Sequence, residues 1–266
     1  MKKILFILLV TANIAFGQNT IYHGPNIDLR SGEQYAMFGD DVKFRASPDV
    51  KSEVLELLKI GTKVEVVEKT VETFLYNGIE SHFYKVKNNG KTGYILGGLI
   101  SLEQKESADT RYLFAYKMED ANYSLLVRVL SKNNSYRELT AALGNPGIDI
   151  HLLDSKGVEG VESMLYVNNR AEACGVYGGE IYFFQTKDGL KKAFTTEIYS
   201  DAGVFWVSEK LIFPNDDDGV AGKIVYEIEQ GEYGDEATNE VHVSKTSREL
   251  RWENGEILPK IEASER

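Results

Sequence analysis

The side chains best suited to nucleophilic chemistry are a single cysteine, Cys174, and four histidines, at positions 23, 82, 151 and 242. A catalytic thiol needs a base beside it, for which His151 and His242 are the candidates, and an electropositive setting that lowers its pKa. Cys174 instead precedes a glycine-rich segment typical of a strand. We therefore expect Cys174 to be a buried small apolar residue rather than a nucleophile.

Carboxylates cluster in two places that invite a metal or a hydrolytic interpretation. Asn215–Gly219 gathers oxygen donors that suit calcium, but its spacing departs from that of the helix-loop-helix calcium loop, so we expect a solvated turn. Glu227 and Glu229 share one face of an expected strand, as a glycosidase pair would, but we expect them to face water. The histidines show no metal-ligand spacing. The sequence therefore predicts no catalytic residue, no metal site and no cofactor.

Composition places the chain among folded globular proteins. Its 266 residues are 42% apolar and 27% charged, and at this length one domain commonly becomes two. With 30 Lys and Arg against 41 Asp and Glu, the net charge is -11, which is the wrong sign for neutralising phosphates. We therefore expect two domains and no nucleic-acid partner.

The N-terminus carries the pattern of a secretory signal. Two lysines precede the apolar run Ile4–Val10, and the small residues Ala15 and Gly17 follow it. The run has seven apolar residues, whereas a helix that crosses a bilayer needs about 20. Gln18 stands where a lipoprotein would carry a cysteine. We predict that residues 1–17 are a cleaved signal peptide and that the protein is secreted or periplasmic, with no membrane span and no lipid anchor.

Residues 35–102 show a pattern typical of short antiparallel strands. Apolar and polar residues alternate in four segments separated by glycine and asparagine turns: Val42–Arg45, Lys63–Val67, Phe83–Lys87 and Thr92–Ile95. We expect five short strands that close a small β-barrel.

The same stretch resembles a known family. The segments Val42–Pro48, Val54–Val66, Phe83–Val86 and Gly90–Leu96 resemble, in order and spacing, the bacterial SH3-like domain. The resemblance covers roughly residues 35–102. Members of this family commonly bind cell-wall peptide or serve as accessory modules, so the resemblance implies binding rather than catalysis.

Family members often bind their ligand in an aromatic groove. The resemblance therefore implies a ligand-binding role for four aromatic residues: Tyr76, Phe83, Tyr84 and Tyr94. The alternative for each of them is a place in the barrel core. Phe83 stands where the family usually carries Trp, and the connection Glu68–His82 is longer than the family's usual few residues.

That long connection contains three bulky apolar residues, Phe74, Leu75 and Tyr76, before an Asn77-Gly78 turn. Asn-Gly between apolar segments is the strongest short-range signal for a β-hairpin. We expect a hairpin whose tip packs against the C-terminal domain. The alternative is an exposed apolar patch that meets a partner.

The remaining sequence predicts a second, larger antiparallel domain over residues 111–266. Residues 19–34 lack periodicity and indicate a leading segment, and the polar run 103–110 indicates a linker between the domains. Tyr136–Leu143 has helical character. In the run Tyr182–Phe184 we expect core on one face and one exposed ring. The fold class is therefore mainly β, with an SH3-like barrel followed by a β-rich domain.

Three functions follow from these features. The first is a non-catalytic exported protein of the bacterial envelope that recognises cell-wall peptide or an envelope protein. The second is a cell-wall hydrolase that uses Cys174 as its nucleophile. The third is a structural or assembly factor whose β-domain adds a strand to a partner. The absence of a credible active-site motif favours the first, and we predict that the protein is not an enzyme.

Overall fold

The computed structural model describes residues 22–24, 28–202, 204–234 and 241–261. The described chain is almost entirely β-strand, with one 3-10 helix, η1, at Gly97–Leu99, so the prediction of a mainly β fold is confirmed. Within these residues there is no helix that is both long and apolar enough to span a membrane. The predicted signal peptide at residues 1–17 lies outside the described residues.

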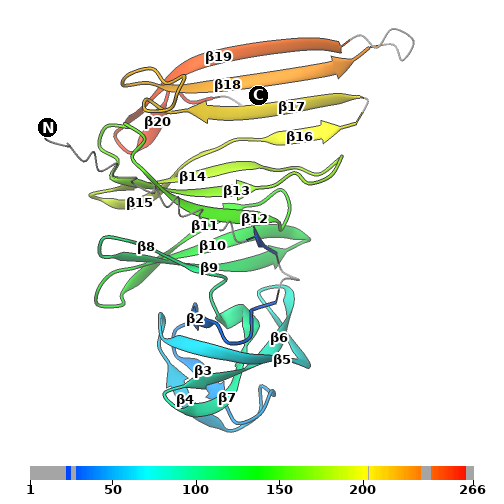
Figure 1. Cartoon of the computed structure of the whole chain (residues 1–266), viewed down its shortest axis with the longest axis vertical. Coiled ribbons are helices and arrows are strands. Elements are labelled where there is room, and N and C mark those ends of the chain that lie inside the picture. Colours follow the sequence, from blue (N-terminus) through cyan, green and yellow to red (C-terminus); the bar gives the residue numbers. More distant parts are fainter. Residues whose placement is uncertain (1–21, 25–27, 203, 235–240, 262–266) are drawn as a thin grey trace, which may run out of the picture.

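The N-terminal unit is an antiparallel sheet curled into a small barrel (Figure 1), and it has six strands instead of the five expected. In spatial order its strands are β2 (Gln34–Ala36), β5 (Lys63–Tyr76), β6 (Ile79–Asn88), β7 (Lys91–Leu96), β3 (Val42–Arg45) and β4 (Val54–Leu58). Phe44, Val66, Val86 and Ile95 are fully buried inside it, because alternate side chains of each strand point inward.

Three further antiparallel sheets follow, which we name the lower, middle and upper sheets. The lower sheet contains β8 (Gln104–Ser107), β9 (Thr110–Glu119), β10 (Asn122–Leu130) and β11 (Tyr136–Ala142). The middle sheet contains β1 (Tyr22–His23), β12 (Ile148–Asp154), β13 (Ser163–Asn169), β14 (Gly179–Thr186) and β15 (Gly189–Thr195). The upper sheet contains β16 (Ile198–Asp201), β17 (Phe205–Ile212), β18 (Ile224–Tyr233), β19 (Val241–Glu253) and β20 (Glu256–Leu258).

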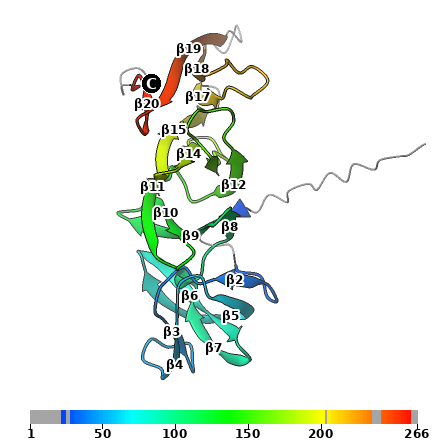
Figure 2. The same cartoon turned by 90° about the vertical axis from the view of Figure 1, so that its left-hand side faces the viewer.

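The barrel and the three sheets are stacked in order along the long axis of the molecule (Figures 1 and 2). The middle sheet is buried on both faces. On β14, Phe183 points into the core shared with the lower sheet, whereas Tyr182 and Phe184 point into the core shared with the upper sheet. All three rings are buried. The expectation of one exposed ring in this run is therefore wrong, because a second sheet covers the other face.

The lower sheet is also buried on both faces, since the barrel packs under it. Leu113 and Leu126 lie in one cluster with Phe38 and Ile60 of the barrel. Arg128 reinforces this joint. Its guanidinium donates a 2.6 Å hydrogen bond to the carbonyl oxygen of Phe38 and lies 4.3 Å from the centroid of the Phe38 ring, an arrangement that adds cation–π attraction to the apolar contact.

The long connection forms the predicted hairpin, with β5 and β6 joined by a turn at Asn77-Gly78. Its tip contacts the lower sheet through backbone, because the amide of Met118 donates a 2.8 Å hydrogen bond to the carbonyl oxygen of Asn77. Phe74 and Leu75 remain 45% and 67% exposed. Packing of the tip is thus confirmed, but the turn and the side chain of Ile79 provide it and not Phe74 or Leu75.

Segments expected to lie outside the packed elements are strands. Residues 103–110 are not a linker, because β8 and β9 form a hairpin within this stretch. Tyr22–His23 pairs with β12 at the edge of the middle sheet, so the stretch 19–34 is not wholly unpacked. Tyr136–Leu143 is not a helix, since β11 pairs with β10 along its whole length. Tertiary pairing there overrides the helix propensity of residues such as Leu139.

The prediction that Cys174 is buried is wrong. Its side chain is exposed, in the loop between β13 and β14. The loop turns through Gly175, whose φ is +75° and whose amide donates a 2.8 Å hydrogen bond to the carbonyl oxygen of Ser200. The glycine-rich sequence therefore forms a surface turn here and not the start of a strand, and the strand begins only at Gly179.

Exposure of Cys174 predicts that Cys174→Ser is nearly neutral for folding. We expect the free energy of unfolding, measured by urea denaturation, to change by less than about 0.5 kcal/mol, as for other surface positions. One thiol equivalent should react with a thiol reagent in the native protein. A thiol that reacts only after unfolding would contradict the exposed position.

The contact between the hairpin tip and the lower sheet predicts that alanine destabilises the protein to different extents at two glycines with the same φ. Gly78 and Gly90 both have φ of +77°, but a Cβ on Gly78 would fall 1.9 Å from the carbonyl oxygen of Met118, whereas one on Gly90 meets nothing within 4 Å. We expect Gly90→Ala to lower the free energy of unfolding by about 1 kcal/mol. Gly78→Ala should lower it by about 3 kcal/mol. Equal losses would mean that the tip contact contributes nothing.

Candidate functional site

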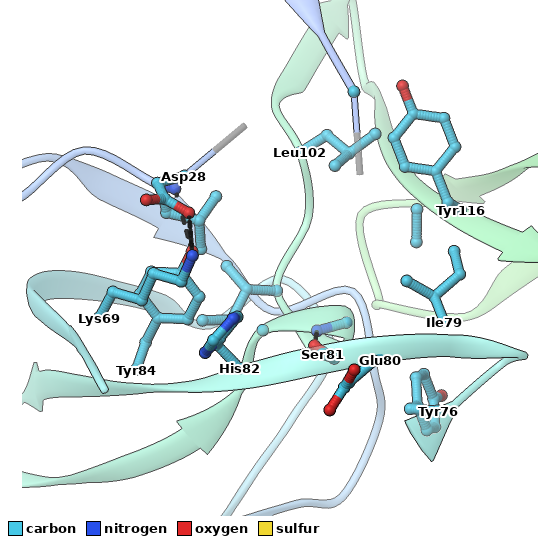
Figure 3. A pocket seen from close by; sticks show the side chains of 16 residues that line it. Asp28, Lys69, Tyr76, Ile79, Glu80, Ser81, His82, Tyr84, Leu102 and Tyr116 are labelled. Atoms are coloured by element: carbon cyan, nitrogen blue, oxygen red, sulfur yellow. Dashed lines mark hydrogen bonds and ion pairs between the residues drawn. The ribbon is translucent and has the colours of Figure 1, made fainter. Parts of the chain in front are cut away.

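A cavity of about 90 Å³ lies where the barrel meets the lower sheet. Its walls come from β5, β6, η1, the segment before β2 and β9 of the lower sheet. Asp28 and Lys69 lie at one end, and Ile79, Leu102 and Tyr116 lie at the other (Figure 3). A space of this size holds a few water molecules or one small group of a larger ligand. The cavity therefore has a charged end and an apolar end.

An ion pair marks the charged end. The ammonium of Lys69 donates to the carboxylate of Asp28 at 2.7 Å, and the two side chains are 33% and 56% exposed. The hydroxyl of Tyr84 lies beside this pair and accepts a 3.3 Å hydrogen bond from the amide of Leu29. Burial raises the pKa of Tyr84 to about 12, so this hydroxyl is neutral and able to donate at physiological pH.

A bulge in the hairpin shapes the wall beside Lys69. Lys69 pairs with Tyr84 and Thr73 pairs with His82, so three residues of β5 stand opposite one residue of β6. His82 holds the bulge in place, because its Nδ1 lies 2.9 Å from the carbonyl oxygen of Thr70 and donates to it. Bulges of this kind redirect side chains near functional sites, and here the bulge separates Lys69 from the hairpin tip.

Two glycines let aromatic rings close around the cavity. A Cβ on Gly97 would fall 2.8 Å from the ring of Tyr84, and one on Gly98 would fall 2.8 Å from the ring of Tyr76. The amide of Gly98 also donates a 2.7 Å hydrogen bond to the hydroxyl of Ser81. The Gly97-Gly98 pair is therefore required by close approach of the rings and not only by a turn.

The structure brings two of the four predicted binding residues together. Tyr76 and Tyr84 both line the cavity. Phe83 does not line it and is only 2% exposed, since neighbouring residues on a strand point to opposite faces. Tyr94 is half-buried on β7, opposite Arg45 of β3, and also lies outside the lining.

Sequence reasoning did not assign Asp28, Lys69 or His82 to this site, although all three line the cavity. Asp28 lies in a segment without periodicity, and Lys69 is one of many exposed charges on a strand. Besides the implied binding residues Tyr76 and Tyr84, the signal that pointed to this region was the unusual length of the connection Glu68–His82. The site depends on contacts between the barrel and the lower sheet, and a local sequence pattern does not predict such contacts.

The other candidate chemical groups are placed as follows. Asn215–Gly219 forms the predicted turn. In it, the ammonium of Lys156 donates a 3.1 Å hydrogen bond to the carboxylate of Asp216. Glu227 lies between Lys210 at 2.8 Å and Lys245 at 3.1 Å. The hydrogen bond from Lys210 is the main cause that lowers the pKa of Glu227. This carboxylate is therefore held ionised in a structural ion-pair network.

The arrangement at the barrel joint suits binding. It combines three tyrosine rings, an imidazole and an accessible ion pair around a small space. Within the part of the chain that the structure describes, no group of three or more His, Cys, Asp or Glu side chains is placed to hold a metal ion.

Comparison with known protein families finds a match in the N-terminal barrel. The family model of the bacterial SH3 domain matches residues 40–101, which covers β3 to η1 and ends beside the cavity. No curated protein and no solved structure matches the chain. The match confirms the resemblance found in the sequence between about 35 and 102. Residues 40–101, which form most of the N-terminal barrel, are thus similar to the bacterial SH3 domain.

Proposed function

We propose that the protein is a non-catalytic binding protein of the bacterial envelope that recognises cell-wall peptide at the cavity between the barrel and the lower sheet. The observation that carries the proposal is the combination of Tyr76, Tyr84 and the Lys69–Asp28 pair around one small space in a domain that matches the bacterial SH3 family. Domains of this family bind cell-wall components in general.

The chemistry of the cavity suits one charged end group of a peptide. A ligand carboxylate at the charged end would accept hydrogen bonds from Lys69 and the Tyr84 hydroxyl, and a ligand amine would replace Lys69 as the partner of Asp28. An aliphatic side chain fits between the rings and Ile79 at the other end. Peptide is therefore favoured over an uncharged sugar chain.

Rigid support for the cavity comes from the joint. The backbone hydrogen bond from Met118 to Asn77 and the contacts of Arg128 with Phe38 connect both sides of the cavity to the lower sheet. A site held on strands loses little conformational entropy when it binds. This supports a role in recognition, with the stacked sheets as a platform.

Export of the protein is part of the proposal. It rests on the signal pattern at residues 1–17 and the proposed cleavage after Gly17. N-terminal sequencing of the protein from culture medium and periplasmic extract would detect Gln18 as the first residue and would separate the two locations.

Two lysines give a matched test of the site. Lys69 and Lys85 each pair with a carboxylate, and their side chains are 33% and 34% exposed, but only Lys69 lines the cavity. In a pull-down with purified cell-wall sacculi, Lys69→Ala should weaken binding about tenfold, as loss of a central contact does. Lys85→Ala should leave binding within about twofold, since exposed ion pairs contribute little.

The outcomes separate the alternatives. Equal loss in both variants would indicate general attraction between charges, and no loss in either would place recognition outside the cavity. Soluble products from the sacculi are measured in the same tube. Products that depend on Cys174 would contradict the non-catalytic proposal and favour a hydrolase.

A further inference from the structure

The charged end of the cavity between the barrel and the lower sheet presents a cation and an anion side by side. The ammonium of Lys69 donates a 2.7 Å hydrogen bond to the Oδ1 oxygen of Asp28. The hydroxyl of Tyr84 donates to the same oxygen at 3.5 Å. Figure 3 shows these three side chains together at one side of the space, across from Ile79. A ligand that enters this end therefore meets both signs of charge at once.

Each member of the ion pair is able to take a second partner. A lysine ammonium has three donors, and the bond to Asp28 uses one of them. A carboxylate has two oxygens with about four acceptor positions, and the contacts from Lys69 and Tyr84 both go to Oδ1. The side chains of Lys69 and Asp28 are 33% and 56% exposed. Both charges are therefore within reach of a ligand without separation of the pair.

A ligand with a single charge would satisfy only one half of the pair. A lone carboxylate beside Lys69 would be repelled by Asp28 and by Glu80, which also lines the cavity. A lone ammonium beside Asp28 would be repelled by Lys69, or would displace it and leave the lysine charge without a partner. A ligand with both charges avoids these costs, because each of its charges faces the opposite charge on the protein.

We propose that the cavity binds an α-amino carboxylate, the zwitterionic end group in which the same carbon atom carries an ammonium and a carboxylate. The ligand carboxylate accepts hydrogen bonds from Lys69, and the ligand ammonium donates to Asp28. The side chain on that carbon extends toward Ile79 and Leu102 at the apolar end (Figure 3). The inference rests on the proposed function of this cavity, and it narrows the cell-wall peptide to one that carries such an end group.

The test compares free alanine with propionate and ethylamine, each of which lacks one of alanine's two charged groups. The full chain is titrated at neutral pH with each compound and with both enantiomers of alanine, and binding is followed by saturation-transfer NMR of the compound. We expect one enantiomer of alanine to bind at least about tenfold more tightly than either analogue. Equal affinities for the three compounds, or no alanine binding at about 100 mM, would overturn the proposal.

A second ion pair of nearly equal exposure gives a matched control. The side chains of Lys85 and Glu68 are 34% and 58% exposed, close to the values for Lys69 and Asp28, but neither of them lines the cavity. Lys69→Ala and Asp28→Asn should each weaken alanine binding about fivefold or more. Lys85→Ala and Glu68→Gln should leave it within about twofold. Equal losses in the two pairs would overturn the assignment of alanine binding to the cavity.

Competition with sacculi separates this inference from the proposed function. We expect alanine to release the protein from sacculi, whereas propionate and ethylamine at the same concentration should not. Sacculus binding that depends on Lys69 but is not reduced by alanine would overturn the α-amino carboxylate and leave the cavity as the recognition site. Sacculus binding that Lys69→Ala does not change, together with alanine binding that it weakens, would contradict the proposed function and leave zwitterion binding intact.

Discussion

Burial of apolar side chains on both faces of the lower and middle sheets is the interaction that holds the layers of this protein together. A single antiparallel sheet commonly leaves one face in water, but here consecutive residues on β10 and β14 alternate between two cores. Leu125 and Leu126 point to different clusters, as do Phe183 and Phe184. Each internal sheet therefore buries apolar side chains against both of its neighbours.

The same constraint creates the cavity at the barrel. Because Phe38 and Ile60 must cover Leu113 and Leu126, the barrel is fixed against the lower sheet, and its long hairpin lies along the joint. The space that remains between the hairpin, η1 and β9 is the cavity that Tyr76 lines. A longer hairpin than the family's usual connection thus becomes part of the contact between two units as well as part of the wall of the cavity.

The upper sheet is the last layer among the described residues. Charged pairs such as Lys210–Glu227 occupy the face that no described sheet covers. Its inner face is covered by the middle sheet only where Leu211 and Tyr226 meet the core. The uncovered end, near Phe205, keeps aromatic residues in contact with solvent.

What the sequence determined by itself was local. Alternation and turn residues predicted the barrel strands, the hairpin at Asn77-Gly78 and the mainly β class, because these depend on neighbours a few residues apart. Only the tertiary structure decided the rest. The strand at Tyr136–Ala142, the exposure of Cys174 and the meeting of Lys69 with Asp28 depend on which segments the fold places side by side. Local sequence patterns do not predict such contacts, because apolar burial and ion pairing act between segments that are distant in the chain.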